Sequence, residues 1–135
     1  MNFLAIDLGD KRTGLATGDD IVRIVQPITV LETPIGEQLI HDIHSVIKEH
    51  GIDCIVMGLP LNMDGSESQR SKLTKSFSEK LQEITMLPIK FQDERLTSAA
   101  AEEQLNQSGK THKQKKKLRD ALAAAEILKD FLHSN

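Results

Sequence analysis

The stretch "AIDLGDKRTGLAT", residues 5–17, runs from an apolar segment into a carboxylate and then into a basic turn. Asp7 follows the apolar residues, Lys11 and Arg12 lie in the turn just beyond it, and a second strand-like run follows at once. Glycine and aspartate in so short a connection indicate a tight turn between antiparallel strands. The stretch therefore predicts a strand pair that carries one carboxylate and two cations at one end.

The remainder of the chain alternates strands and helices. Strands are expected at residues 2–8, 12–18 and 21–31, and then within "DCIVMGLP" (53–60) and "IKFQDE" (89–94). A first helix is expected from Thr33, as N-cap before Pro34, to Gly51, and a second from near Ser66, with Gln69 completing a capping box, to about Met86. Two more helices are expected, one from 97 or 98 to about 106 and one over 118–132. Strands separated by helices lie parallel through right-handed crossovers. The sequence thus predicts an α/β fold, in which a mixed sheet of three antiparallel strands followed by parallel strands has helices on both faces.

Length and composition predict one domain over residues 1–135. The chain is 39% hydrophobic and 27% charged with a net charge of −3, which is ordinary for a globular protein. The apolar run that ends at Asp7 is too short for a signal sequence or a membrane span. The one cysteine of the chain, Cys54, fits a reducing compartment and is expected to fill the core. We therefore expect a cytoplasmic protein without a membrane partner.

Three acidic positions are candidates for metal binding, namely Asp7, Glu94 with its neighbour Asp93, and Asp120. Asp7 and Glu94 end strands, and ligands of open α/β sheets gather beyond strand ends. Mg²⁺ takes oxygen ligands, usually one or two carboxylates together with phosphates and water. Ordinary roles are the alternative, because Asp7 could cap a turn, Glu94 could pair with Arg95, and Asp120 could favour the first turn of its helix.

Several cationic segments could contact phosphate. Lys11 and Arg12 could hold a phosphate, although a solvated hairpin turn explains them as well. The segment "KTHKQKKKLR" (110–119) reads as a basic loop that could contact a nucleic-acid backbone, through Lys113, Lys115, Lys116 and Lys117.

Two further patterns have structural alternatives. In "MDGSESQ" (63–69), the amides of Gly65 and Ser66 could bind an anion, or the segment could simply cap a helix. His41 and His44 have helical spacing but no third ligand, and we interpret them as exposed or partly buried helix residues.

Four segments resemble, in order, the signature regions of the YqgF family: "AIDLGDKRTGLA", "VMGLPLNMDGSES", "FQDERLTSAAAE" and "RDALAAAEILKDFL". The resemblance implies a ribonuclease H-like fold and an acidic triad at Asp7, Glu94 and Asp120. It leaves open whether Asp93 contributes. Glu126, where the family more usually has an aliphatic residue, could add a carboxylate near the site or face water.

The resemblance implies a Mg²⁺- or Mn²⁺-dependent endonuclease with two-metal chemistry, acting on structured nucleic acid. The first choice of substrate is the 5′ end of pre-16S rRNA, in ribosome biogenesis. A Holliday junction resolvase that cuts branched DNA is the alternative, and RNA or DNA, monomer or homodimer, stay open. Two further alternatives are a non-catalytic nucleic-acid-binding or ribosome-assembly factor and an ATP-binding protein of the actin and sugar-kinase type.

Overall fold

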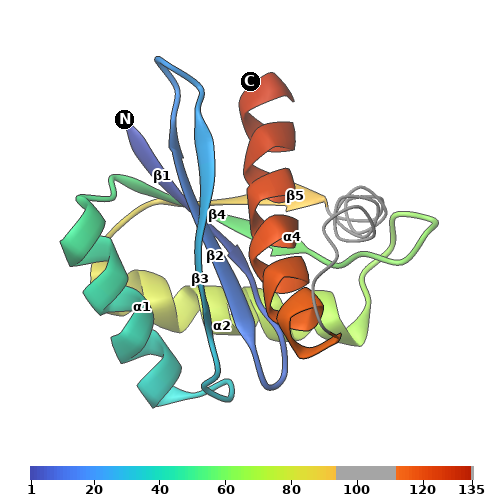
Figure 1. Ribbon diagram of the computed structural model, residues 1–135. Helices are drawn as coiled ribbons and strands as arrows, with labels where there is room; N and C mark the ends of the chain where they lie inside the picture. Colours follow the sequence, from blue (N-terminus) through green and yellow to red (C-terminus); the bar gives the residue numbers. More distant parts are fainter. Residues whose placement is uncertain (94–111, 135) are drawn as a thin grey trace.

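The structure, a computed structural model, describes the backbone of residues 1–93 and 112–134 and the side chains of 1–93 and 120–134. Within them five strands form one sheet in the order β3-β2-β1-β4-β5 (Figure 1). Their bounds are β1 Asn2–Asp7, β2 Thr13–Asp19, β3 Val25–Leu31, β4 Cys54–Leu59 and β5 Ile89–Asp93. β2 is antiparallel to β1 and β3, whereas β4 is parallel to β1 and β5. The predicted mixed sheet is therefore confirmed.

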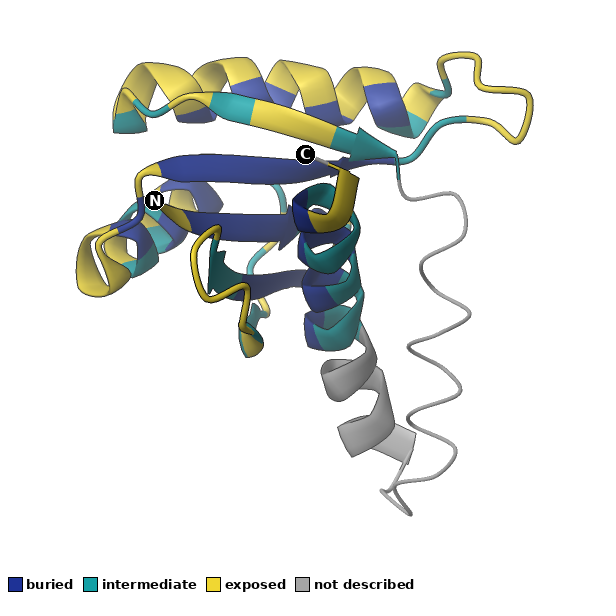
Figure 2. Cartoon of the chain, turned by 90° about the horizontal axis from the view of Figure 1, so that it is seen from above, coloured by how far each residue is buried: buried dark blue, intermediate teal, exposed yellow. Residues whose placement is uncertain are grey.

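Helices cover both faces of this sheet. α1 (Glu37–His50) and α2 (Gln69–Thr85) lie on one face, and α4 (His112–Ser134) lies across the other (Figures 1 and 2). Alternation along β1 sends Leu4 and Ile6 into the core beneath α1 and α2, and sends Phe3 and Ala5 toward α4. β1 and β4 are almost wholly buried because they are central and covered on both sides.

The first predicted helix begins later than expected. α1 starts at Glu37 with Gly36 as N-cap, so the prediction that Thr33 caps it is wrong. The hydroxyl of Thr33 instead donates to a carboxylate oxygen of Asp42 at 2.8 Å. The predicted end is confirmed, because Gly51 adopts the left-handed conformation that closes the helix.

The second predicted helix also begins later. Ser68, not Ser66, is the N-cap of α2, and Ser71 rather than Gln69 completes the capping box. The hydroxyl of Ser66 is bonded to Asp64 at 2.6 Å, which withdraws it from capping. The expected end near Met86 is confirmed, since Met86 is the C-cap.

The predicted basic loop is wrong from residue 112 onward. α4 begins at His112, so Lys113, Lys115, Lys116 and Lys117 belong to its first turns. The helix expected near 97–106 lies outside the described residues. No helix within the described residues combines the length and apolar character that crossing a membrane requires.

Candidate active site

Asp7 ends β1 on the face of the sheet that α4 covers. Ala5 and Phe3, two and four positions earlier, pack in the core beneath α4, and alternation gives Asp7 the same side. Asp7 is partly buried, in contrast to the four apolar residues before it. Its cross-strand partner in β2 is Gly14. The predicted position at a strand end is therefore confirmed, and the face is fixed by register.

Gly14 brings α4 to this same corner. A Cβ built on Gly14 would lie 1.9 Å from the backbone oxygen of Asp120 and 2.4 Å from its carbonyl carbon. Paired residues of neighbouring antiparallel strands point to the same face, at Cα separations of about 5 Å. The missing side chain of Gly14 thus lets the backbone of Asp120 approach the strand end that carries Asp7.

The carboxylate of Asp120 faces a guanidinium. Nε of Arg12 lies 3.2 Å from Oδ2 of Asp120, and the two side chains are 24% and 26% exposed. Oδ2 itself is shielded from solvent. The first-turn role considered for Asp120 is wrong, because α4 begins at His112 and Asp120 lies about two turns inside it, beyond the reach of terminal helix-dipole effects.

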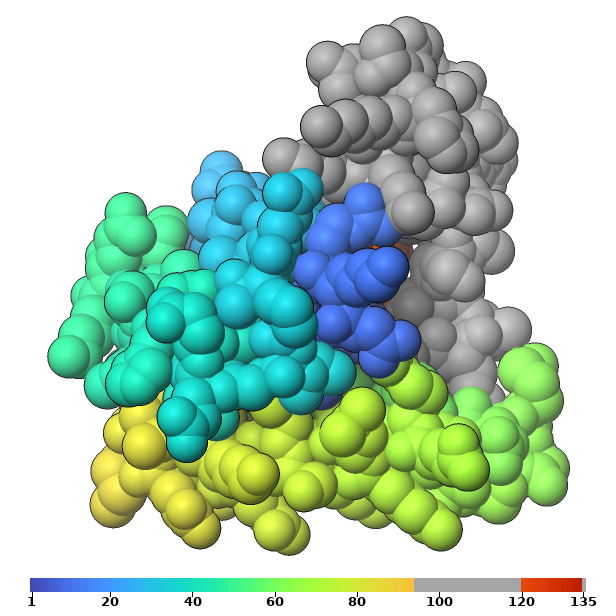
Figure 3. All heavy atoms as spheres, turned by 90° about the horizontal axis from the view of Figure 1, so that it is seen from below, coloured from blue at the N-terminus to red at the C-terminus, as the bar shows by residue number. Residues whose placement is uncertain are grey.

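The loop between β1 and β2 is held from α2. The guanidinium of Arg70 donates to the backbone oxygen of Leu8 at 2.8 Å and pairs with the carboxylate of Asp10. Within the loop, a Cβ on Gly9 would lie 2.2 Å from the backbone oxygen of Arg12. Figure 3 shows this part of the chain at the surface, next to the first part of α2. Sequence reasoning missed Arg70, because a single arginine in a helix carries no signal of a partner some sixty residues away.

Lys11 is exposed in this loop, as a phosphate-binding residue would need to be. Arg12 lies deeper, against Asp120. The loop therefore brings Arg12 and Asp120 together, and leaves Lys11 at the surface.

The loop after β4 does not support the predicted anion site. The amide of Gly65 donates to the backbone oxygen of Asn62 at 2.8 Å, and the amide of Ser66 donates to the carboxylate of Asp64 at 2.9 Å. Both amides are therefore used within the turn. The structural alternative fits better, with capping by Ser68.

Asp93 takes the other face of the sheet. Its partner in β4 is Leu59, in step with Ile55 and Met57, which pack beneath α1 and α2. Asp93 and Asp7 therefore occupy opposite faces by register. Glu94, Lys110 and the side chains of Lys113, Lys115, Lys116 and Lys117 lie outside the described residues. Among the side chains described, no group of three acidic, histidine or cysteine residues is close enough to hold a metal.

The remaining acidic candidate pairs within its own helix. Glu126 is largely buried, and one of its carboxylate oxygens lies 3.4 Å from Nζ of Lys129. It also acts on Asp130, whose pKa is raised by burial first and by the charge of Glu126 second.

The interpretation of Cys54 as a core residue is confirmed, since it is buried beneath α4. The interpretation of His41 and His44 is confirmed as well, since on α1 His41 is exposed and His44 is partly buried.

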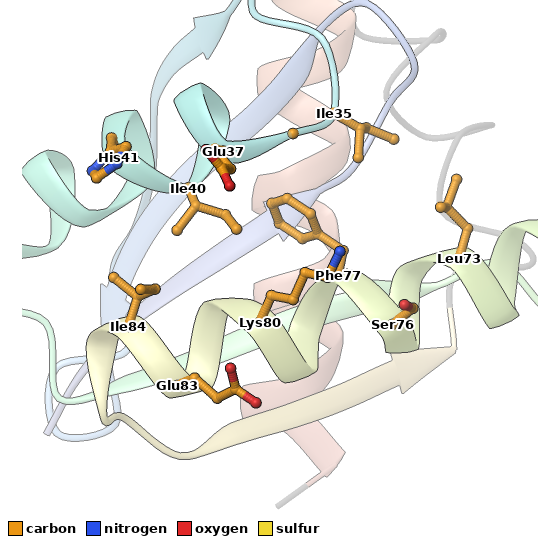
Figure 4. A pocket seen from close by; sticks show the side chains of 11 residues that line it. Ile35, Glu37, Ile40, His41, Leu73, Ser76, Phe77, Lys80, Glu83 and Ile84 are labelled. Carbon is orange, nitrogen blue, oxygen red and sulfur yellow. The ribbon is translucent and has the colours of Figure 1, made fainter.

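A groove of about 670 Å³ lies between α1 and α2, where Ile40 and Phe77 face each other (Figure 4). It lies on the opposite side of the sheet from Asp7 and does not join the candidate site.

Comparisons with known proteins identify relatives over nearly the whole chain. The family model described as "RuvX: Holliday junction resolvase" matches residues 1–134. A relative from an Anaeromyxobacter species, named "Putative pre-16S rRNA nuclease", is 37% identical over 132 residues. This alignment covers 98% of the present chain and 96% of the relative.

Solved structures share the fold at low identity. Thermus thermophilus RuvC, in complex with a Holliday junction substrate, has a TM-score of 0.60 at 13% identity and covers 99% of this chain and 95% of its own. The fowlpox virus Holliday junction resolvase has a TM-score of 0.62 at 15% identity, with complete coverage of both chains. These similarities confirm the ribonuclease H-like α/β fold.

Proposed function

The chain belongs to the RuvX family, the YqgF family of the sequence resemblance, and on this premise we propose that it is a metal-dependent endonuclease acting on structured nucleic acid. The observation that carries the proposal is the corner formed by Asp7, Gly14 and Asp120. There a strand end and a helix from the other end of the chain bring two carboxylate residues to one face of the sheet.

The residues at this corner fit a divalent cation. Asp7 and Asp120 supply carboxylate oxygens, which are the ligands that Mg²⁺ and Mn²⁺ prefer. Asp120 already attracts a positive charge, that of Arg12. We assign Asp7 and Asp120 as metal ligands and Glu94 as the third. The opposite-face position of Asp93 supports Glu94 as the member of the pair that serves the site. A metal pair held there would activate the attacking water and stabilise the departing oxygen.

The cations at this end of the sheet would hold the substrate. Lys11, exposed in the loop, would bind a backbone phosphate, and the lysines of the first turns of α4 (Lys113, Lys115, Lys116 and Lys117) would extend the contact along the strand. Arg12 would bind a second phosphate. Arg70 holds the backbone of the loop that carries Lys11 and Arg12, so this backbone would need little reorganisation when phosphate binds.

The proposed substrate is the 5′ end of pre-16S rRNA, in the cytoplasm. The names of relatives that align over almost their whole length support this choice. A second candidate substrate is a four-way DNA junction, which the description of the family model favours. Symmetric cutting of a junction requires two sites, and hence a homodimer.

The test is cleavage of two matched labelled substrates, a pre-16S rRNA 5′ segment and a four-way DNA junction, with and without Mg²⁺ or Mn²⁺. Wild-type protein is expected to cut in a metal-dependent way. Asp7→Asn is expected to lower the rate about 1,000-fold, because metal stabilisation of the transition state amounts to several kcal/mol. Its melting temperature should stay unchanged.

Asp20→Asn is the matched control, since it removes an exposed carboxylate beyond the other end of β2. It should cut like wild type. Full activity of Asp7→Asn at an unchanged melting temperature would overturn the assignment. Salt-sensitive RNA binding without cleavage by wild type would instead indicate a non-catalytic assembly factor.

A further inference from the structure

Arg12 and a bound metal would need the same carboxylate. Nε of Arg12 lies 3.2 Å from Oδ2 of Asp120, and about three quarters of each side chain is shielded from solvent. An arginine side chain does not lose its proton in proteins, so its charge stays in place. A divalent cation on Asp120 would then lie within a few ångströms of a fixed positive charge, in a partly buried setting where screening is weak.

The backbone around Arg12 has little freedom to relieve this conflict. Arg70 holds the loop at Leu8 and Asp10, and the amide of Gly9 donates to the hydroxyl of Thr13 at 3.4 Å. Gly9 also packs directly against the backbone oxygen of Arg12. The guanidinium must therefore leave Asp120 by rotation of its own side chain.

A nucleic-acid phosphate supplies the alternative partner. Guanidinium and phosphate match in geometry and form two parallel hydrogen bonds, which makes phosphate a competitive partner for an arginine already paired with a carboxylate. The same loop presents Lys11 at the surface, where a polyanion would first make contact.

We propose that Arg12 is a phosphate-operated latch on Asp120. Without nucleic acid the guanidinium occupies the carboxylate. A backbone phosphate draws the guanidinium away and frees Asp120 for the divalent cation. The inference rests on the proposed function, because it takes Asp120 as a metal ligand. Binding of metal and of nucleic acid is then positively coupled, and each strengthens the other by the same factor.

The test measures binding instead of cleavage, on the full-length protein. Electron paramagnetic resonance of free Mn²⁺ gives the metal affinity of wild type and of Arg12→Gln without nucleic acid. The variant should bind Mn²⁺ about 5- to 150-fold more tightly, the usual range of coupling between sites. Lys11→Gln removes the same charge from the same loop and should change the affinity less than about twofold, since Lys11 is exposed and its charge is screened.

The reciprocal measurement uses fluorescence anisotropy of a labelled 2′-O-methyl oligoribonucleotide. Mn²⁺ should tighten the binding of this oligonucleotide to wild type by the same factor by which Arg12→Gln raises the Mn²⁺ affinity. This enhancement by Mn²⁺ should fall to about twofold or less in Arg12→Gln. Arg12→Lys keeps the charge without the planar fork. It should give intermediate values, and it serves as the second variant if Arg12→Gln does not fold.

The outcomes separate the two proposals. Equal Mn²⁺ affinity in wild type and Arg12→Gln, with binding lost in Asp120→Asn, would overturn the latch and leave the metal site standing. Absence of saturable Mn²⁺ binding in every form would overturn both.

Discussion

The two faces of the sheet are built from side chains of different size. Beneath α1 and α2 the buried core is formed mainly by leucine and isoleucine, with Phe77 and Met57. Beneath α4 it contains alanine on both sides of the interface, at Ala5, Ala16, Ala124 and Ala125. Long apolar side chains thus separate α1 and α2 from the sheet, whereas the backbone of α4 comes close to the strands on the other face.

This difference explains why the candidate site lies on the α4 face. At Gly14 the approach is so close that the backbone of Asp120 fills the place of a side chain, and at Gly18 a Cβ would lie 3.1 Å from Leu128. Thick apolar packing stabilises the fold but keeps backbones apart. Small residues allow polar groups of a helix to approach the end of a strand, as Asp120 approaches the end of β1 that carries Asp7.

The largest expected effect on stability is on the face of the sheet that α1 and α2 cover. Ile55→Ala, at a fully buried position, should lower the free energy of unfolding by about 2–5 kcal/mol, because it leaves a cavity as well as losing transfer energy. Urea unfolding measures the loss. Mn²⁺ affinity of the folded protein should stay unchanged, and a weakened metal site would show that the two faces are not independent.

A smaller loss of stability, with a larger effect on the site, is expected on the α4 face. Gly14→Ala should cost about 1–3 kcal/mol, because α4 must shift to admit the methyl group. Mn²⁺ binding should weaken as Asp120 moves from Asp7. Gly36→Ala is the control, since its added Cβ meets nothing within 4 Å. It should cost no more than about 1 kcal/mol, as alanine is a poorer N-cap residue. Similar metal binding in both variants would contradict the role given to Gly14.

The smallest effect is expected farther along α4. The pKa of Asp130 is raised, first by burial and then by Glu126, so ionisation of its carboxyl is less favourable in the folded than in the unfolded protein. Asp130→Asn should therefore raise the free energy of unfolding at pH 7, by about 0.5 kcal/mol at most. The gain should vanish below the ordinary pKa of 3.8, where the carboxyl is protonated in both states. Urea unfolding between pH 3 and 7 checks this, and an equal gain at pH 3 would exclude a charge effect.

Much of the fold could be predicted from local patterns. Continuous apolar runs located the central strands, and Gly51 located the end of α1, because these signals depend on residues next to one another. The helix starts were less predictable. Thr33 and Ser66 have the right chemistry for caps, but their hydroxyls are bonded to Asp42 and Asp64 instead.

The candidate site divides in the same way. The sequence located Asp7 at a strand end, and resemblance supplied Asp120, but neither could show that Gly14 joins them. The side taken by Asp93 required the register of β5 against β4. The metal-binding roles of Asp7, Glu94 and Asp120 stay predictions, and so do the phosphate-binding roles of Lys11, Arg12 and the four lysines.

The sequence by itself determined the order and kind of the strands and helices over residues 1–93, the acidic and basic residues available, and the family. Local hydrogen bonding, side-chain periodicity and motif identity suffice for these, since each is written in neighbouring positions. Only the tertiary structure decided that Arg12 meets Asp120, that Arg70 holds the loop beside them, and that Asp7 and Asp120 share a face. Such contacts join residues far apart in the chain, and they depend on how closely a helix and a sheet can approach, which is set by packing.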